Sequence, residues 1–296
     1  MHTSMRRGDG KAAFWMLLPF ALFFTAFVVY PLAANIYYSF TNYRFGSIGD
    51  TEFVGFANYV RLFNDRGFTI SLRNTFVYAF FSIILLSVAG LFFALASNRS
   101  SRIFKTARSV FIAPYAVSFV AASLIWLMLL DPGLGAVNKI LIAFGVDRPP
   151  SWLFDADLAL PSLIAINVWK NAGYVMLLFL AGLQNVSPDL YDAAKIDGAN
   201  LFQKIRNVTL PAISPVTVFV LVTVCIESFK TFEQVKIITR GGPMLRTSTV
   251  VYQIYLRAFE DFQMSYAAAQ SVALLVIILL VTLANFKAVT KRGAEG

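Results

Sequence analysis

The sequence predicts an all-α, polytopic membrane protein with about six transmembrane helices. The chain has 296 residues, of which 58% are hydrophobic and 14% charged, and its mean hydropathy is +0.67. A soluble domain is about 45–50% apolar and about 25% charged, so this composition indicates the membrane class. About six apolar runs are long enough to cross a hydrocarbon core about 30 Å thick. They lie near residues 13–34, 75–97, 109–130, 159–182, 211–235 and 267–288.

Lysine and arginine are concentrated in the short segments on one side of these runs. The residues concerned are Arg6, Arg7, Lys11, Arg99, Arg102, Lys105, Arg108, Lys195, Lys204, Arg206, Lys287, Lys291 and Arg292. Cytoplasmic segments near transmembrane helices carry such an excess, so we expect both termini and the 187–210 loop in the cytoplasm. The same sorting accounts for the net charge of +9. We therefore expect membrane lipid around the chain and no nucleic-acid partner.

A cleaved signal peptide is the alternative interpretation of residues 1–34, with Arg6 and Arg7 as its charged region. The apolar run is longer than a signal peptide needs, and Pro19 and Pro31 bracket a stretch of membrane length. We therefore interpret this run as the first transmembrane span.

No enzyme site or cofactor site is expected in this chain. Cys225 is the only cysteine and His2 the only histidine, so neither an intrachain disulfide nor a Cys/His metal centre can form. The sequence also lacks the Gly-x-x-x-x-Gly-Lys-Ser/Thr loop that holds the phosphates of ATP. Any energy for the chain's function must then come from another subunit.

A polar helix is predicted between the fourth and fifth spans, at residues 187–198. Ser187 is a good N-cap, Pro188 suits the first turn, and Asp189 complements the positive helix N-terminus. Gly198 fits the left-handed position that follows a helix. A short charged helix on one membrane face indicates a docking surface for a soluble partner.

The amino-acid sequence of this loop resembles the EAA signature of binding-protein-dependent ABC importer permeases. That signature reads Glu-Ala-Ala, three residues, Gly, nine residues, and then Ile-x-Leu-Pro. Asp192-Ala193-Ala194, Gly198 and Val208-Thr209-Leu210-Pro211 match its spacing, with Asp for Glu and Val for Ile. Further stretches resemble the sugar-transporting branch of the family, and the likeness covers nearly the whole chain. These further stretches are residues 53–59, Trp169-Lys170-Asn171, residues 180–184 and residues 238–243.

The resemblance implies a permease subunit that translocates a sugar or sugar-like solute across the bacterial cytoplasmic (inner) membrane. A second homologous permease, two ATPase subunits and an extracytoplasmic solute-binding protein are the implied partners, and ATP and Mg are implied to bind the ATPases. The transmembrane permease domain is then residues 12–290, with cytoplasmic tails at 1–11 and 291–296. ATPase coupling is implied for Asp189, Tyr191, Asp192, Ala193, Ala194, Asp197, Gly198, Leu210 and Pro211. Contact with the binding protein is implied for Gly241, Gly242 and Pro243.

Two polar stripes at helical spacing lie within the fourth and fifth runs. The first comprises Asn167, Lys170, Asn171 and Tyr174, and the second comprises Glu227, Lys230, Thr231 and Gln234, preceded by Thr223. Polar groups in hydrocarbon face a neighbouring helix or a water-filled route. One interpretation is a solute path; the other is packing between helices, including a Lys170–Glu227 pair. Weaker candidates are Tyr78, Ser82, Tyr115, Ser118, Gln263, Tyr266 and Gln270.

Two other functions are compatible with parts of the sequence. An ABC permease for an amino acid, phosphate or peptide would share the EAA loop, and the Thr-x-Gly-Gly-Pro turn at 239–243 favours the sugar branch over it. A secondary transporter should show inverted repeats and a buried acidic relay, and neither is evident. Lys170 and Lys230 favour an anionic solute unless acids neutralise them. The sequence does not identify the sugar.

Overall fold

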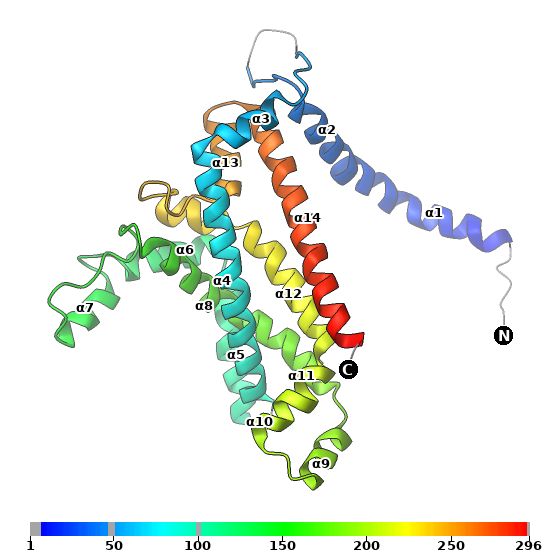
Figure 1. The fold of residues 1–296 in the computed structure, drawn as a ribbon, viewed down its shortest axis with the longest axis vertical. Helices are drawn as coiled ribbons and strands as arrows, with labels where there is room; N and C mark the ends of the chain where they lie inside the picture. Colours follow the sequence, from blue (N-terminus) through cyan, green and yellow to red (C-terminus); the bar gives the residue numbers. More distant parts are fainter. Residues whose placement is uncertain (1–6, 47–50, 99–101, 295–296) are drawn as a thin grey trace. The chain divides into compact units, whose positions relative to one another are not determined.

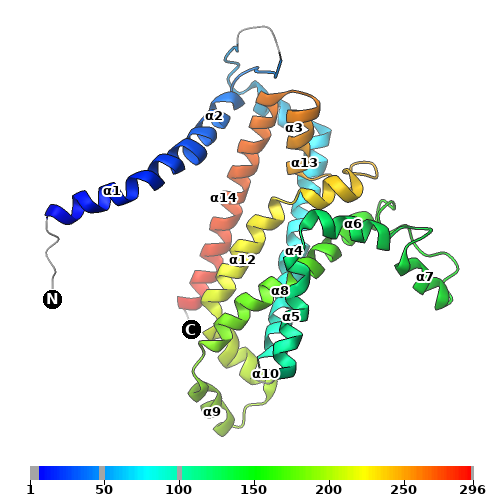
Figure 2. The ribbon, with the colours of Figure 1, turned by 180° about the vertical axis from the view of Figure 1, so that it is seen from behind.

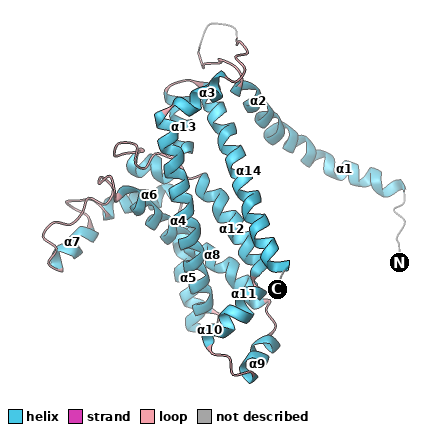
Figure 3. Cartoon of the chain, viewed as in Figure 1, coloured by secondary structure: helices cyan, strands magenta, loops and turns pink. Residues whose placement is uncertain are grey.

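The computed structural model describes residues 7–46, 51–98 and 102–294. These residues form helices joined by loops, and no strand occurs among them (Figure 3). Contacts divide the chain into two compact units, one of residues 1–64 and 254–273 and the other of residues 65–253 and 274–296. The all-α, multi-pass prediction is therefore confirmed.

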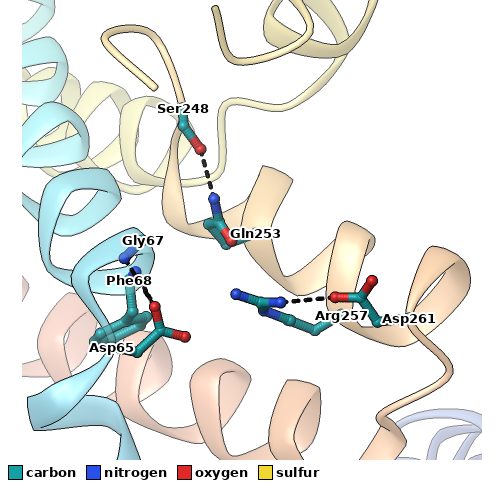
Figure 4. Close-up of polar contacts among 7 residues, drawn as sticks. All are labelled: Asp65, Gly67, Phe68, Ser248, Gln253, Arg257 and Asp261. Atoms are coloured by element: carbon teal, nitrogen blue, oxygen red, sulfur yellow. Dashed lines mark hydrogen bonds and ion pairs between the residues drawn. The ribbon is translucent and has the colours of Figure 1, made fainter. Parts of the chain in front are cut away.

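The first unit contains the N-terminal apolar helix and several shorter segments from two parts of the chain. Its elements are α1 (Arg7–Phe24), a π-helical turn (Thr25–Val29), α2 (Tyr30–Ser39), α3 (Ala57–Asn64), a second π-helical turn (Leu256–Glu260) and the first residues of α14 (Met264–Ala294). Asn58 Nδ2 donates to the carbonyls of Ser39 and Thr41, and Thr41 Oγ1 lies 2.7 Å from Ser265 Oγ. Arg257 and Asp261 form an ion pair of 2.7 Å (Figure 4).

The second unit contains the remaining helices, which follow the colour order of Figures 1 and 2. They are α4 (Arg66–Ser97), α5 (Arg102–Ala116), α6 (Phe119–Leu129), α7 (Ala136–Ala143), α8 (Ala159–Gln184), α9 (Pro188–Ile196), α10 (Leu201–Lys204), a π-helical turn (Ile205–Thr209), α11 (Leu210–Ala212), α12 (Ser214–Phe229), a π-helical turn (Val235–Thr239), α13 (Val250–Tyr255), whose last two residues belong to the first unit, and α14 from Leu274 on.

Helix α4 begins well before the predicted start at residue 75. The Asp65 side chain accepts hydrogen bonds from the backbone N–H groups of Gly67 and Phe68, at 2.8 and 3.1 Å (Figure 4). These are two of the donors that a helix N-terminus leaves unpaired. The cap therefore extends α4 beyond the apolar run that the sequence reveals.

The predicted runs at 109–130 and 211–235 are not single straight helices, and this is a correction to the sequence analysis. Four helices among the described residues are long and apolar enough to span a membrane, and each of two bent pairs supplies one more if it is counted as one span. The pair at 106–129 bends by 95° after Ala116, and the pair at 201–229 bends by 73° at Ile213. Pro114 and Pro215 lie beside the bends, where proline removes a backbone donor.

Helix α8 is the central element of the second unit, because glycines allow its neighbours to approach closely. A Cβ added to Gly173 would overlap the Phe111 carbonyl of α5 and lie 2.8 Å from Ile112 Cα. On α4, a Cβ added to Gly90 would lie 2.8 Å from Val175 Cβ of α8. Close backbone approach through small residues is the usual way in which membrane helices pack.

We predict that Gly173→Ala destabilises the folded chain, since backbone atoms of α5 cannot move aside as a flexible side chain can. Overpacking of this kind costs about 1–3 kcal/mol. The melting temperature of the detergent-purified protein should fall. Gly133→Ala is the matched control, because an added Cβ there meets only Asp131 Oδ1 at 3.7 Å. Equal melting temperatures for both variants would contradict the close α5–α8 contact.

Candidate functional site

A pocket of about 490 Å³ lies where the broken helices of the second unit meet α4 and α8. Its lining residues come from five helices and from the segment after α12. They are Tyr78, Leu86, Tyr115, Phe119, Asn167, Asn171, Tyr174, Val175, Thr223, Val224, Glu227, Ser228, Lys230, Thr231 and Glu233. The volume is within the range of about 300–1,000 Å³ that is common for small-molecule sites.

Lys170 supports the break between α5 and α6 rather than lining this pocket. Its side chain is buried, and its Nζ donates to the Tyr115 carbonyl at 2.9 Å. That carbonyl is one of those that a helix C-terminus leaves unpaired, and a cation is favoured there. The ammonium group also lies 5.2 and 5.6 Å from the ring centroids of Tyr115 and Phe119. Lys170 therefore positions two aromatic rings of the pocket wall.

A second break follows α12, where the chain leaves the helix after Phe229. Thr249 Oγ1 donates to the Thr231 carbonyl at 3.1 Å, which pairs a backbone group at the break. Gln234 is fully buried, and its Nε2 donates to Tyr78 Oη and to Thr231 Oγ1. The continuous helix predicted over 211–235 is thus replaced by a helix, a break and a π-helical turn. Gln234 braces that break and does not line the pocket.

The charged residues of the pocket are Glu227, Lys230 and Glu233. Lys230 Nζ lies 3.3 Å from Glu227 Oε1, and both side chains are more than half exposed. The considered Lys170–Glu227 pair is absent, because each residue has another partner. Sequence reasoning missed Glu233, although it lies three residues after Lys230 and such residues are neighbours on a helix.

Neutral polar and aromatic groups make up most of the remaining wall. The Tyr115 and Tyr174 rings are stacked, with centroids 4.8 Å apart and planes at 11°. Asn171 Nδ2 donates to Asn167 Oδ1 at 2.7 Å, and Asn167 Nδ2 donates to Ser82 Oγ at 3.1 Å. The stripe on α8 therefore faces the pocket, except for Lys170.

The weaker candidates for the solute path do not all lie at the same pocket. Tyr78 and Tyr115 line the pocket, whereas Ser118 caps α6 by accepting from Ala121 N. In the first unit, Gln263 and Tyr266 line a small separate pocket, and the Arg61 guanidinium lies 3.9 Å from the Tyr266 ring centroid. Gln270 is fully buried.

The predicted docking helix is present as α9, with no buried residue along its length. Ser187 Oγ accepts from Asp189 N, and Gly198 has φ +75°, as the left-handed position requires. The Tyr191 hydroxyl lies 3.1 Å from Thr209 Oγ1, which ties the helix to the following segment. The exposed residues among the candidates are Asp189, Asp192, Ala193, Asp197, Gly198, Leu210 and Pro211, and the half-exposed ones are Tyr191 and Ala194.

The Gly-Gly-Pro loop is held rigidly by a buried polar network. Asn74 Nδ2 donates to the carbonyls of Leu245 and Ser248, and Thr247 Oγ1 donates to the Gly242 carbonyl. Gly241 is buried, and Gly242 and Pro243 are half-buried. The exposed tip of this loop is 244–246.

A pocket at the meeting of interrupted helices, within a chain that has several helices apolar enough to span a membrane, is typical of membrane transport proteins. The chain matches the family described as "Binding-protein-dependent transport system inner membrane component" over residues 86–290. It belongs to that family, and it is a permease subunit of an importer. This identification confirms the resemblance found in the sequence. A family member of this kind is a transporter component and not an enzyme.

Several relatives share nearly the whole length of the chain. A probable ABC transporter permease protein of Pyrococcus horikoshii is 32% identical over 90% of this chain and 91% of its own. The probable ABC transporter permease protein YesP of Bacillus subtilis is 34% identical over 95% and 91%. The sn-glycerol-3-phosphate transport system permease protein UgpA of Yersinia pestis is 34% identical over 94% and 93%.

A solved structure shows the same fold. It is a bacterial alginate ABC transporter in complex with an alginate pentasaccharide-bound periplasmic protein, and the matching chain has a TM-score of 0.83. The sequence identity is 25%, and the match covers 94% of this chain and 93% of that one.

We predict that Lys170→Met destabilises the protein, because it removes the donor to the Tyr115 carbonyl in a hydrogen bond that is partly buried. A hydrogen bond from a charged donor contributes about 1.5–3 kcal/mol, and partial burial places the loss at the lower end of that range. Lys230→Met is the matched control, since its ion pair is exposed and such pairs contribute about 0–1 kcal/mol. Thermal unfolding of the detergent-purified chain, followed by tryptophan fluorescence, measures both. A loss for Lys230→Met as large as that for Lys170→Met would contradict the supporting role of Lys170.

Proposed function

We propose that this permease translocates a sugar or sugar-like solute through the pocket described above, after delivery by an extracytoplasmic binding protein. The single observation that carries the proposal is the convergence of two helix breaks on one polar pocket. Non-helical backbone at membrane depth is tolerated where it is buried in protein or lines a water-filled cavity. Transporters commonly bind their solutes at such discontinuous helices.

The chemistry of the pocket wall supports a polyhydroxylated solute. Side-chain amides of Asn167 and Asn171 and hydroxyls of Thr223, Ser228 and Thr231 offer both donors and acceptors. The stacked Tyr115 and Tyr174 rings offer apolar faces beside them. Relatives named for glycerol phosphate transport and for alginate transport also favour solutes of this class.

A second permease subunit of the same fold completes the path. Glu227 and Lys230 are more than half exposed at the rim of the pocket. Charged groups within the bilayer are costly unless they face protein or water. The rim therefore favours cover by a partner subunit, and the inner membrane of a bacterium, with both termini cytoplasmic, is the expected setting.

Two ATPase subunits dock on the surface formed by α9 and α10, and they hold the ATP and Mg. Four large apolar side chains are exposed there, which is unusual beside so many charges. They are Leu190, Ile196, Leu201 and Phe202, with exposed fractions of 50, 87, 76 and 69%. Exposed apolar patches rimmed by charge are typical of protein interfaces. The exposed carboxylates of Asp189, Asp192 and Asp197 form the charged part of this surface.

Closure of the ATPases would then push on α9 and change which side of the membrane the pocket faces. Tyr191 and Thr209 connect α9 to the segment leading into α12, which supplies one wall of the pocket. Such a cycle requires a two-state element that the bound nucleotide biases.

We predict that Gly198→Val abolishes uptake while leaving the chain in the membrane, and that Gly198→Asn retains most uptake. No atom lies within 4 Å of an added Cβ, so the effect is conformational and not steric. A β-branched residue at φ +75° is strained by about 1–2 kcal/mol or more, whereas asparagine tolerates this region.

For each variant, solute uptake is measured in membrane vesicles, and ATPase association is measured by co-purification. Wild-type uptake and ATPase binding by Gly198→Val would contradict the docking role of the loop. Equal losses in both variants would show that glycine is needed for a reason other than backbone conformation.

A further inference from the structure

The pocket carries an excess of negative charge among its described lining residues. Glu227 and Glu233 contribute carboxylates, and Lys230 contributes the only ammonium group. Because Lys230 pairs with Glu227 at 3.3 Å, the charge of Glu233 is left without an opposite charge from the pocket lining.

Lys170, the other cation close to this region, is not available to a solute. Its ammonium group donates to the Tyr115 carbonyl and lies against the rings of Tyr115 and Phe119, which themselves line the pocket. The side chain is 4% exposed. The sequence argument for an anionic solute relied on Lys170 and Lys230. In the structure Lys170 does not line the pocket, and the charge of Lys230 is offset by Glu227.

We infer that this pocket selects a polyhydroxylated solute without an anionic group. This rests on the proposed function, because it concerns the solute of the same pocket. A phosphate or carboxylate on the solute would meet the carboxylate of Glu233, which no charge of the pocket lining offsets, and like charges repel. The hydroxyls of an uncharged solute can instead donate to the carboxylates and accept from the amides of Asn167 and Asn171. The charge preference therefore differs from that expected of permeases for glycerol phosphate or alginate.

A thiol placed in the pocket can report this charge preference without knowledge of the solute. Cys225 is buried and is the only cysteine of this chain, so Cys225→Ser gives a permease chain without thiols, and labelling is measured on this chain. Thr223→Cys in that background places one thiol on the pocket wall. The assembled importer is treated with methanethiosulfonate reagents bearing either a trimethylammonium or a sulfonate group, and the two rates are compared with those for free 2-mercaptoethanol.

The cationic reagent should modify residue 223 at least about fivefold faster than the anionic reagent, after that correction. Glu233→Gln should lower this ratio, because it removes the carboxylate that Lys230 does not neutralise. Asp157→Asn is the matched control, since Asp157 is an exposed acid outside the pocket lining. High salt should also reduce the ratio through screening.

The outcomes separate this inference from the proposed function. A ratio at or below one, or a ratio that Glu233→Gln leaves unchanged, overturns the inference while leaving a water-accessible pocket in place. Met244→Cys, at an exposed loop tip, serves as the positive control for reagent access. If that thiol reacts and the thiol at 223 reacts with neither reagent, the pocket is not a water-filled path and both proposals fail.

Discussion

The structure of the second unit depends on how backbone groups are paired where helices are interrupted. Water is absent from hydrocarbon, so a carbonyl freed by a break needs a donor from within the protein. Lys170 supplies one for Tyr115 at the α5–α6 bend, and Thr249 supplies one for Thr231 after α12. The donors to these two carbonyls, Lys170 and Thr249, do not line the pocket. The side chains that do line it are therefore not needed to pair these carbonyls.

The supporting groups and the solute-facing groups are thus distinct although they are neighbours in sequence. On α8, Asn171 faces the pocket, whereas the preceding residue, Lys170, faces the end of α5. After α12, Thr231 lines the pocket and Gln234 braces it through Tyr78. Substitutions one or two residues apart should then separate stability from transport. The glycine contacts allow α8 to lie close to α4 and α5.

Much of this arrangement could be predicted from the sequence, for identifiable reasons. Apolar runs gave the spans, and Ser187 and Gly198 gave the ends of α9, because caps are determined by local residues. The bends after Ala116 and at Ile213 and the end of α12 at Phe229 were missed, since apolar content reports neither a bend nor a helix end. The stripe on α8 was recognised by its spacing, but the partner of Lys170 lies 55 residues away in the chain. Glu233 could have been found by the same spacing, since it lies three residues after Lys230.

A structure of the assembled importer, trapped with its solute between the two permease subunits, tests the central claim most directly. The claim is that the interrupted helices form the solute site. The account predicts solute density in contact with Tyr115, Tyr174 and Thr231, with the Lys170 ammonium still on the Tyr115 carbonyl. Solute bound elsewhere along the path, with lipid or side chains filling this pocket, would contradict it.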